Sequence, residues 1–477
     1  MRQAPLLSSS RIRENSVLQS NTPLSIQADL ATLEALAQTP ALSASELVKA
    51  LQAIYQKAAN ADFSDYDVRA IGKSAPEIMY RLFDVRIALR NRIGEFEQRG
   101  LMTADVQQAL RDCFRILRYV TDMVGEVRTG NARYNEDALA LPAFRGPDYN
   151  TLVNYAFYKG PDLPFKSGDV MLMRGQAHNS AAIARIGDVD SQFSHLAMIY
   201  IDDAGQHFVV ESLIEDGAIV NTLGHSLAHG SARAVLYRHK DPVLAARAAK
   251  MIHDHVAPTR QTFARRILYD FSMRLDERRR LFCAKVVRLA FQMASEGRIN
   301  LPRYPTKLAM KNRDFLNRIG VTATQTFAPA DIDLETSFDL VCEWQDYRGT
   351  SNIRLQDFTF DKLFEWMDRY EYRFEETMII RIVSLLGRLT SYFSDTAKDI
   401  LASVAPKVPI NMPRKAVATI AMLHKTAEPI VRELRELEAA TVRQTGRPMH
   451  GNEIFEALER IRLREGSRIG YLVSKVG

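Results

Sequence analysis

The chain has 477 residues, of which 46% are hydrophobic and 25% charged, and its formal net charge is +6 at pH 7. These proportions exclude a disordered chain, and the length predicts about three domains. Arg381 and Arg388 interrupt the longest apolar stretch, residues 378–393, so no run reaches the ~18 residues of a membrane helix. The N-terminal segment lacks the apolar core of a signal peptide, and we therefore expect a cytoplasmic protein.

Three cysteines, Cys113, Cys283 and Cys342, are too few and too scattered for a disulfide framework, and none belongs to a CxxC pattern. We expect all three to be reduced thiols. Cys113 lies on the apolar stripe of a helix predicted over residues 106–124, and Cys342 lies in an apolar run, so both are predicted to be buried.

The sequence pattern of the N-terminal third predicts helices, and we find no motif of catalytic or ligand-binding residues in it. Residues 1–24 are polar and aperiodic, and we interpret them as a flexible lead-in, followed by a helical domain at residues 25–140. Ser43 and Ser74 are each followed three residues later by glutamate, which is the pattern of a capping box. A helix is therefore predicted to start at each of them.

A second domain, predicted at residues 150–350, combines strands and helices. Glycine, asparagine and proline accumulate between about residues 128 and 166, as in a linker or loops. Short strands are then predicted at residues 169–173, 196–201, 207–211, 218–223 and 234–237, and helices at 242–255 and from Cys283 onward. A turn signal at residues 202–205 makes the second and third strands a hairpin.

The helical period returns in residues 351–477, which we predict to be a helical C-terminal domain, with prolines between residues 406 and 413 marking a break. The predicted fold class is α+β. A small antiparallel sheet and the helix of Cys283 form the central domain, and all-α regions flank it.

Cys283 is predicted to open an apolar-faced helix directly after three arginines, residues 278–280. The unpaired N–H groups and partial positive charge of a helix start stabilise a thiolate. A cysteine nucleophile also needs a base and a group that orients the base. His195 lies at the mouth of one predicted strand and Glu211 at the end of the next, and side chains on one face of adjacent strands can meet.

Each of these residues also has a plain structural interpretation. Cys283 taken alone is a small buried hydrophobe, His195 a satisfied histidine at a strand end, and Glu211 a surface carboxylate beside a turn. Their order and spacing together favour a catalytic triad.

The motifs around these residues resemble a known family. Phe193-Ser194-His195 before an apolar strand, Glu211-Ser212, Tyr269-Asp270-Phe271 and Phe282-Cys283 at a helix start resemble the circularly permuted, papain-like cysteine hydrolases of the NlpC superfamily, and within it the YiiX/YebB-like group. Residues 167–170 and 338–341 with Trp344 resemble the first strand and the closing segment of that group. The resemblance covers about residues 164–348.

The resemblance implies that Cys283 is the nucleophile, His195 the general base and acid, and Glu211 the orienting group, with the backbone N–H of Cys283 in an oxyanion hole. Tyr269 occupies a family motif position and is expected to line the substrate cleft. Where the family usually has Ser-Glu after its cysteine, this chain has Ala284-Lys285. This departure bears on substrate contacts, and Lys285 is an expected substrate-binding residue together with Tyr269 and Arg280.

Basic residues gather before the cysteine, and histidines occur in pairs. The arginines are expected either to bind an anionic substrate, such as a lipid headgroup or a carboxylate, or to form a solvated flank: Arg260, Arg265, Arg266, Arg274, Arg278, Arg279 and Arg280. The histidines lack companion ligands in a recognised metal pattern: His225, His229, His253 and His255. We therefore expect no metal and no cofactor. Nucleic-acid binding is not expected either, because no zinc-finger or RNA-module signature is present.

The sequence thus predicts a cysteine hydrolase that cleaves an amide or ester bond through an acyl-thioester. The relatives suggest peptide, fatty-acyl amide or lipid substrates, and acyl transfer is a variant of the same chemistry. Expected partners are this substrate, an anionic group or membrane surface, and a protein bound by the helical flanks. Two alternatives stay open: a non-catalytic binding or scaffold protein on a papain-like core, and a secreted bacterial effector that acts as a deamidase or protease.

Overall fold

The computed structural model describes residues 25–130, 144, 150–158, 160, 163–227, 231–308, 311–375, 377 and 411–474. The expected lead-in at residues 1–24 and the apolar stretch at 378–393 lie outside these residues. The chain divides into two compact units, Met1–Asp137 with Leu434–Arg460, and Ala138–Glu433 with Ile461–Gly477. Two of the three boundaries between the units fall inside α13 (Arg414–Thr445) and α14 (Gly451–Glu465).

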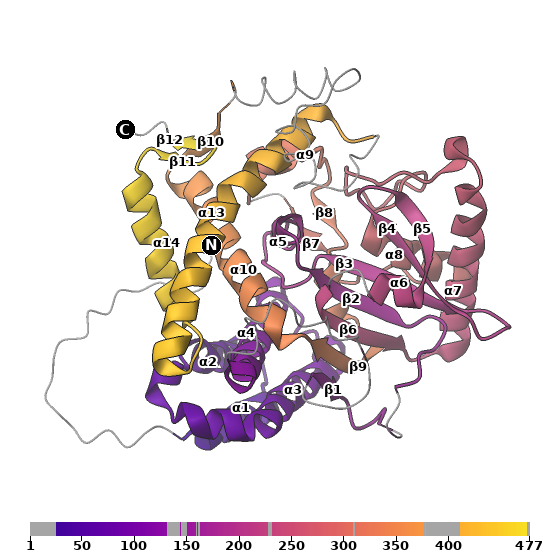
Figure 1. Ribbon diagram of the computed structural model, residues 1–477. Helices are drawn as coiled ribbons and strands as arrows, with labels where there is room; N and C mark the ends of the chain where they lie inside the picture. Colours follow the sequence, from indigo (N-terminus) through magenta and orange to yellow (C-terminus); the bar gives the residue numbers. More distant parts are fainter. Residues whose placement is uncertain are drawn as a thin grey trace, which may run out of the picture. The chain divides into compact units, whose positions relative to one another are not determined.

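The first unit contains the described residues of Leu434–Arg460, from α13 and α14, and five helical elements from the start of the chain: α1 (Ile26–Gln38), α2 (Ala44–Ala59), η1 (Phe63–Asp65), α3 (Val68–Gln98) and α4 (Ala104–Thr129) (Figure 1). α4 packs against both α2 and α3, and α1 packs against α2 and α3. Cys113 of α4 is fully buried between them, and its thiol donates a hydrogen bond to the Leu51 carbonyl at 3.1 Å. Burial raises the pKa of the Cys113 thiol, and the prediction that this cysteine is a core residue is confirmed.

The two predicted helix starts have different outcomes. Ser43 caps α2, because its hydroxyl accepts a hydrogen bond from the Glu46 N–H. The start predicted at Ser74 is wrong. Asp67 accepts hydrogen bonds from two N–H groups of the first turn, so α3 already begins at Val68 and Ser74 lies inside it.

Pro76 lies within α3 rather than in its first turn. A proline inside a helix leaves the carbonyl four residues earlier without its helical donor, and here that carbonyl belongs to Gly72. The Arg128 guanidinium of α4 donates to this carbonyl at 3.3 Å. A side chain distant in sequence therefore supplies the hydrogen bond that the proline removes.

The second unit is organised around a seven-stranded sheet in the order β1-β9-β6-β2-β3-β4-β5, in which all neighbours are antiparallel (Figure 1). Its strands are β1 (Thr151–Val153), β2 (Val170–Gly175), β3 (His195–Ile201), β4 (His207–Leu213), β5 (Gly217–Thr222), β6 (Ser231–His239) and β9 (Phe338–Gln345). The predicted hairpin is β3 and β4. The α+β fold class is confirmed.

β1 lies in the region that we interpreted as a linker or loops. Its three residues pair with Cys342, Glu343 and Trp344 of β9. Two asparagine side chains extend this pairing, because Asn150 donates to the Gln345 carbonyl and Asn154 to the Leu340 carbonyl. A three-residue strand is too short to leave a periodic pattern in the sequence.

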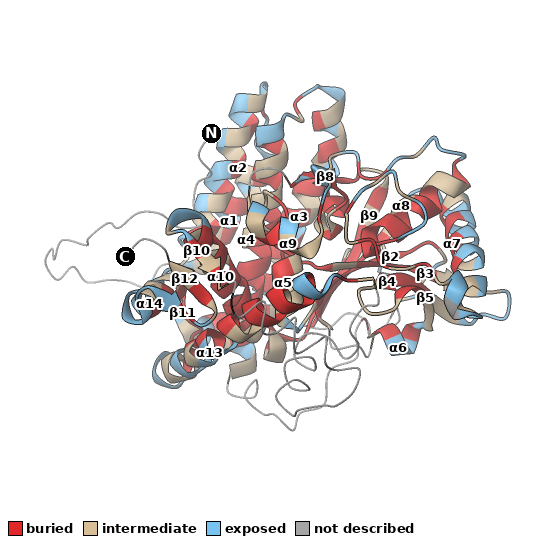
Figure 2. Ribbon diagram, turned by 90° about the horizontal axis from the view of Figure 1, so that it is seen from above, coloured by how far each residue is buried: buried red, intermediate tan, exposed pale blue. Residues whose placement is uncertain are grey.

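Helices cover the sheet. α7 (Pro242–Val256) and α8 (Cys283–Ala294) pack against each other and against β3 and β4, whereas α10 (Tyr347–Arg369) contacts β6 and α5 (His178–Ile183). The central strands are buried nearly throughout, as Figure 2 shows in red. The remaining elements are α6 (Leu223–Leu227), η3 (Ala257–Arg260), η4 (Phe263–Arg265), β7 (Thr306–Lys307), α9 (Arg313–Ile319), β8 (Gln325–Thr326), η5 (Pro329–Leu334), β10 (Tyr372–Phe374), β11 (Arg468–Ile469) and β12 (Leu472–Ser474).

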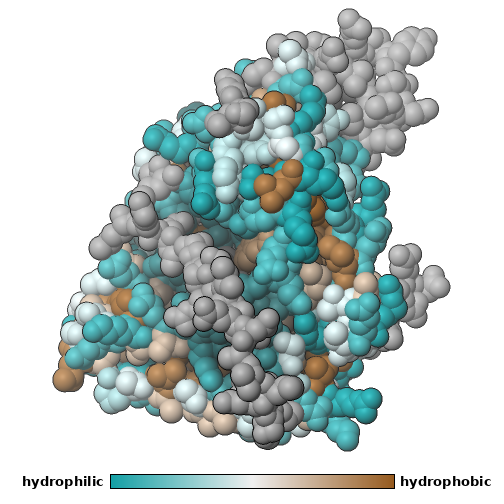
Figure 3. All heavy atoms as spheres, turned by 90° about the vertical axis from the view of Figure 1, so that its left-hand side faces the viewer, coloured by the Kyte–Doolittle hydropathy of each residue, from teal (hydrophilic) through white to brown (hydrophobic). Residues whose placement is uncertain are grey.

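The visible face in Figure 3 is mostly hydrophilic, and its hydrophobic residues form small separate patches. Within the described ranges, no helix is both long and apolar enough to span a bilayer.

Candidate active site

Cys283 is the first residue of α8. Phe282 precedes it in an extended conformation and offers no side-chain cap, and the first N–H groups of a helix have no partner within the helix. The helix is fixed because its apolar residues, such as Val286, Val287 and Ala290, are buried against the sheet. Cys283 itself is 5% exposed, and its Sγ lies 3.9 Å from the Ser194 carbonyl oxygen.

His195 and Glu211 meet across the β3–β4 hairpin. The register pairs Met198 with Val210, so Glu211 lies diagonally opposite His195 on the same face of the sheet. His195 Nε2 is 2.8 Å from Glu211 Oε2. The structure thus brings together the imidazole and the carboxylate that the sequence predicted to be base and orienter.

Glu211 accepts two further hydrogen bonds that the sequence did not predict. Asn221 of β5 and Ser226 of α6 both donate to its Oε1 at 2.9 Å. Burial raises the pKa of Glu211, but the hydrogen bonds from His195, Asn221 and Ser226 outweigh burial and hold the pKa below its usual value. The carboxylate therefore stays charged beside the imidazole.

His195 also interacts with Cys283. Burial lowers the pKa of His195, but hydrogen bonds with the side chains of Cys283 and Glu211, and their negative charges, raise the pKa to about 10. The His195 side chain is 18% exposed, so the imidazole is accessible from one side. The three side chains form a continuous chain of contacts from carboxylate to imidazole to thiol.

Tyr269 lies beside the cysteine. It forms a bridge with Leu281, whose N–H donates to the Leu268 carbonyl at 3.1 Å, and the Ser212 hydroxyl of β4 donates to the Leu281 carbonyl at 2.6 Å. Burial and the charge of Cys283 raise the pKa of Tyr269. The phenol is therefore neutral where it borders the thiol.

The other two expected substrate-binding residues have different surroundings. Lys285 Nζ is 2.7 Å from Asp270 Oδ2, and both side chains are 3% exposed. Burial lowers the pKa of Lys285, and the hydrogen bond with Asp270 opposes that effect. Arg280 is exposed. The substrate-binding role of both residues stays a prediction.

Tyr269 also lines an apolar pocket. Its lining comes from α5, α9, α10 and α13 and from the segment after Tyr269: His178, Asn179, Ala182, Ile183, Ile186, Ile214, Tyr269, Phe271, Met273, Phe315, Ile319, Phe360, Met412, Ile420, Leu423 and His424. The rings of His178 and His424 stand perpendicular to each other with centroids 4.6 Å apart. Sequence reasoning did not find this pocket, because its walls come from segments far apart in the chain.

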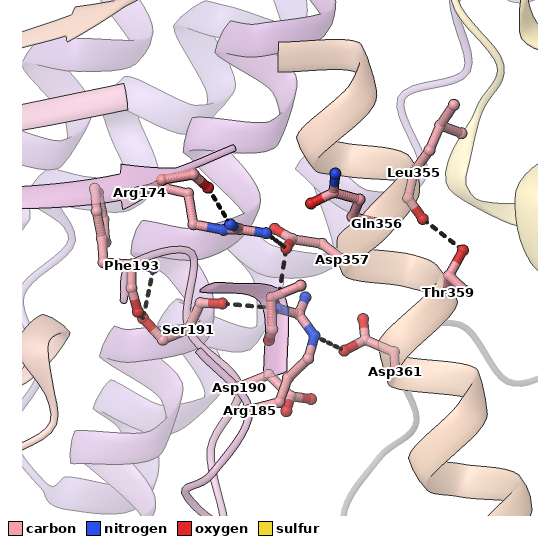
Figure 4. A network of polar contacts seen from close by, with 12 residues as sticks. Arg174, Arg185, Asp190, Ser191, Phe193, Leu355, Gln356, Asp357, Thr359 and Asp361 are labelled. Carbon is pink, nitrogen blue, oxygen red and sulfur yellow. Dashed lines mark hydrogen bonds and ion pairs between the residues drawn. The ribbon is translucent and has the colours of Figure 1, made fainter. Parts of the chain in front are cut away.

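A buried network of charges holds the loop that leads to His195 (Figure 4). Asp357 of α10 accepts hydrogen bonds from Arg174 at 2.8 Å and from Arg185 at 3.1 Å. Arg185 also donates to Asp361 and to the Ser191 carbonyl. The loop before β3 is thereby tied to α10.

With this geometry established, the chain can be compared with known proteins. Residues 164–332 match the permuted papain-like amidase enzymes of the YaeF/YiiX, C92 family. This confirms the predicted resemblance to the permuted papain-like YiiX group. Neither the curated proteins nor the solved structures include a match to the chain.

The matched segment begins before β2 and ends in η5, and it contains Cys283, His195, Glu211 and Tyr269. The family description, an amidase, supports hydrolysis of an amide bond as the class of reaction.

Proposed function

We propose that the protein is a cysteine amidase that forms a thioester on Cys283. The single observation that carries the proposal is the contact chain from Glu211 through His195 to Cys283 at the start of α8. A protonated imidazole beside a thiol favours the thiolate, and the thiolate is the reactive form. The match to an amidase family supports the choice of an amide as the bond cleaved.

In the proposed mechanism, the Cys283 sulfur bonds to the carbonyl carbon of the substrate while His195 carries a proton. The oxyanion that forms faces the unpaired N–H groups at the start of α8. The carbon–nitrogen bond then breaks, and His195 gives its proton to the leaving amine. Water next attacks the thioester and His195 accepts a proton from it. The carbon–sulfur bond then breaks, the carboxylic acid leaves, and the Cys283 thiolate is restored beside the protonated His195. Glu211 keeps the imidazole oriented throughout.

The acyl part of the substrate is proposed to be an aliphatic chain. The apolar pocket that includes Tyr269 supports this, because it is lined mainly by side chains such as Ile183, Met273 and Leu423. Apolar lining of this kind favours an apolar ligand over a polar one. A fatty-acyl amide fits this pocket better than a polar peptide.

The test is covalent capture of the acyl group. Intact protein mass is measured after mixing with a p-nitroanilide of dodecanoic acid, together with release of the amine. The wild-type chain should gain one acyl group and release amine, and C283A should do neither. C113A is the matched control, because it removes a buried thiol from another unit and should behave as the wild type. Equal capture by C283A would refute the proposal.

A further inference from the structure

A basic segment lies directly before the candidate nucleophile. We define the arginine segment as residues 257–280, which contain seven arginines and three acidic residues. Five of these arginines are exposed, at positions 265, 274, 278, 279 and 280. The last of them is three residues from Cys283.

One of the three acidic residues of the arginine segment pairs with Arg274, and none of the three forms an ion pair with the other four exposed arginines. Asp270 is held by buried Lys285, and Asp276 pairs with Arg274 at 2.6 Å. Glu277 accepts a hydrogen bond from the backbone N–H of Arg279. Across the described part of the chain, no carboxylate forms an ion pair with the guanidinium of Arg265, or with those of residues 278–280.

The same segment borders the apolar pocket. Phe271 and Met273 line the pocket, and the bridge between Tyr269 and Leu281 closes the loop of residues 270–280 at its base. One loop therefore has apolar side chains in the pocket at its beginning and exposed guanidiniums at its end. Arg280, at the end of this loop, stands three residues before the first residue of α8.

We propose that the arginine segment is a docking surface for a bilayer that contains anionic phospholipids. Arginines attract phosphate and carboxylate headgroups, and the adjacent apolar pocket accommodates an aliphatic chain drawn from the same bilayer. The choice of a lipid surface over another polyanion rests on the proposed acyl substrate. Docking places Tyr269 and Cys283 at the lipid interface.

The strength of this docking follows from the charge count. A basic residue near an anionic bilayer contributes about 1 kcal/mol, so three arginines change the partition coefficient by on the order of 100-fold. Added salt should weaken the attraction, because the Debye length shortens from ~10 Å at 0.1 M to ~3 Å at 1 M.

The experiment measures co-sedimentation of the full chain with two kinds of vesicle, phosphatidylcholine alone and phosphatidylcholine with about 30 mol % phosphatidylserine. The wild type should bind only the anionic vesicles, and R278Q/R279Q/R280Q should bind them on the order of 100-fold more weakly. K49Q/R432Q/R443Q removes three exposed charges outside the arginine segment and should bind as the wild type. C283A should also bind as the wild type, because docking does not use the thiol.

Three results would overturn the proposal. The first is equal binding of the wild type to both kinds of vesicle, and the second is unchanged binding by the arginine variant. The third is no vesicle binding together with tight, arginine-dependent binding of tRNA or polyglutamate, which would assign the surface to another polyanion. A chain that binds anionic vesicles but never forms the thioester would refute only the amidase proposal.

Discussion

At the scale of single residues, both carboxylate oxygens of Glu211 accept hydrogen bonds. Its two oxygens accept hydrogen bonds from His195, Asn221 and Ser226, so the carboxylate cannot turn away from the imidazole without breaking one of them. A neutral amide offers one acceptor and adds a donor. In E211Q, one of the three donors must therefore lose its partner.

We expect E211Q to lower kcat by about 10²- to 10⁴-fold with a small change in KM, because the imidazole loses the group that orients it. S226A removes one hydrogen-bond donor but leaves the negative charge of Glu211, and it should lower kcat by less than about 10-fold. Steady-state hydrolysis of the dodecanoyl anilide checks both variants. Activity of E211Q equal to that of S226A would contradict the role of Glu211.

The pKa of His195 gives a pH dependence with a defined sign. The folded protein holds the His195 proton up to pH about 10, against 6.5 for free histidine. The contribution of this raised pKa to the free energy of unfolding is fully present below pH 6.5 and is lost as the pH rises through about 10. Amide hydrolysis should decline over the same upper range, because the leaving amine then lacks its proton donor.

Alkylation by iodoacetamide needs no proton donor, so its rate should not decline above pH 10. NMR titration of His195 in C283A should give a lower pKa than in the wild type, because Cys283 helps to hold the proton. Parallel declines of alkylation and hydrolysis would contradict the role of His195 as the proton donor to the leaving amine.

At the scale of elements, Gly217 sets the position of the segment that carries Tyr269. Its φ is +71°, and a Cβ at this position would collide with the Ile267 carbonyl, which accepts a hydrogen bond from the Ala218 N–H at 2.8 Å. Gly205, in the β3–β4 turn, has a similar φ of +77° but open space around it.

G205A should destabilise the protein by about 1 kcal/mol through backbone strain alone. G217A should cost about 1–3 kcal/mol more, because the neighbouring segment must also move. Urea unfolding gives both values, and their difference isolates the collision. Equal losses of unfolding free energy in the two variants would show that the backbone near Gly217 moves to make room for a Cβ without further cost.

The Asp270–Lys285 pair joins the Tyr269 segment to α8. Removing one partner leaves a buried charge, so K285M should lower the free energy of unfolding by about 3–5 kcal/mol. D270N/K285M should recover part of that loss, because neither charge remains. Urea unfolding of the single and double variants measures the coupling, and additive losses would contradict it.

At the scale of the whole molecule, the residues that line the apolar pocket are spread over more than 240 positions of the sequence, from His178 to His424. Ile420 of α13 lines it, whereas Leu437 of the same helix does not. I420W should fill the pocket and raise KM for a dodecanoyl anilide at least about 10-fold while leaving the acetyl anilide unaffected. L437W is the matched control, and an equal loss on both substrates would refute the acyl pocket.

The same scale explains what the sequence can predict. His195, Glu211 and Cys283 could be named as candidates because His195 opens a strand and Cys283 opens a helix with a clear hydrophobic period, and Glu211 lies in the strand that follows His195. Asn221 and Ser226 were not, because a polar residue in an edge strand or a short helix carries no sign of the carboxylate that it binds. The start of α3 was misplaced because Asp67 caps it without a following glutamate in the capping-box position.

The position of β9 has a consequence for synthesis. This strand pairs with β1 on one side and β6 on the other, yet it is the last strand of the sheet to leave the ribosome. Residues 195, 211 and 283 are all translated before it. Until β9 arrives, the nascent sheet ends at an open β6 edge, and such an edge can pair with another chain. Aggregation through the β6 edge is therefore favoured during the interval in which Cys283 has been synthesised and β9 has not yet paired with β6.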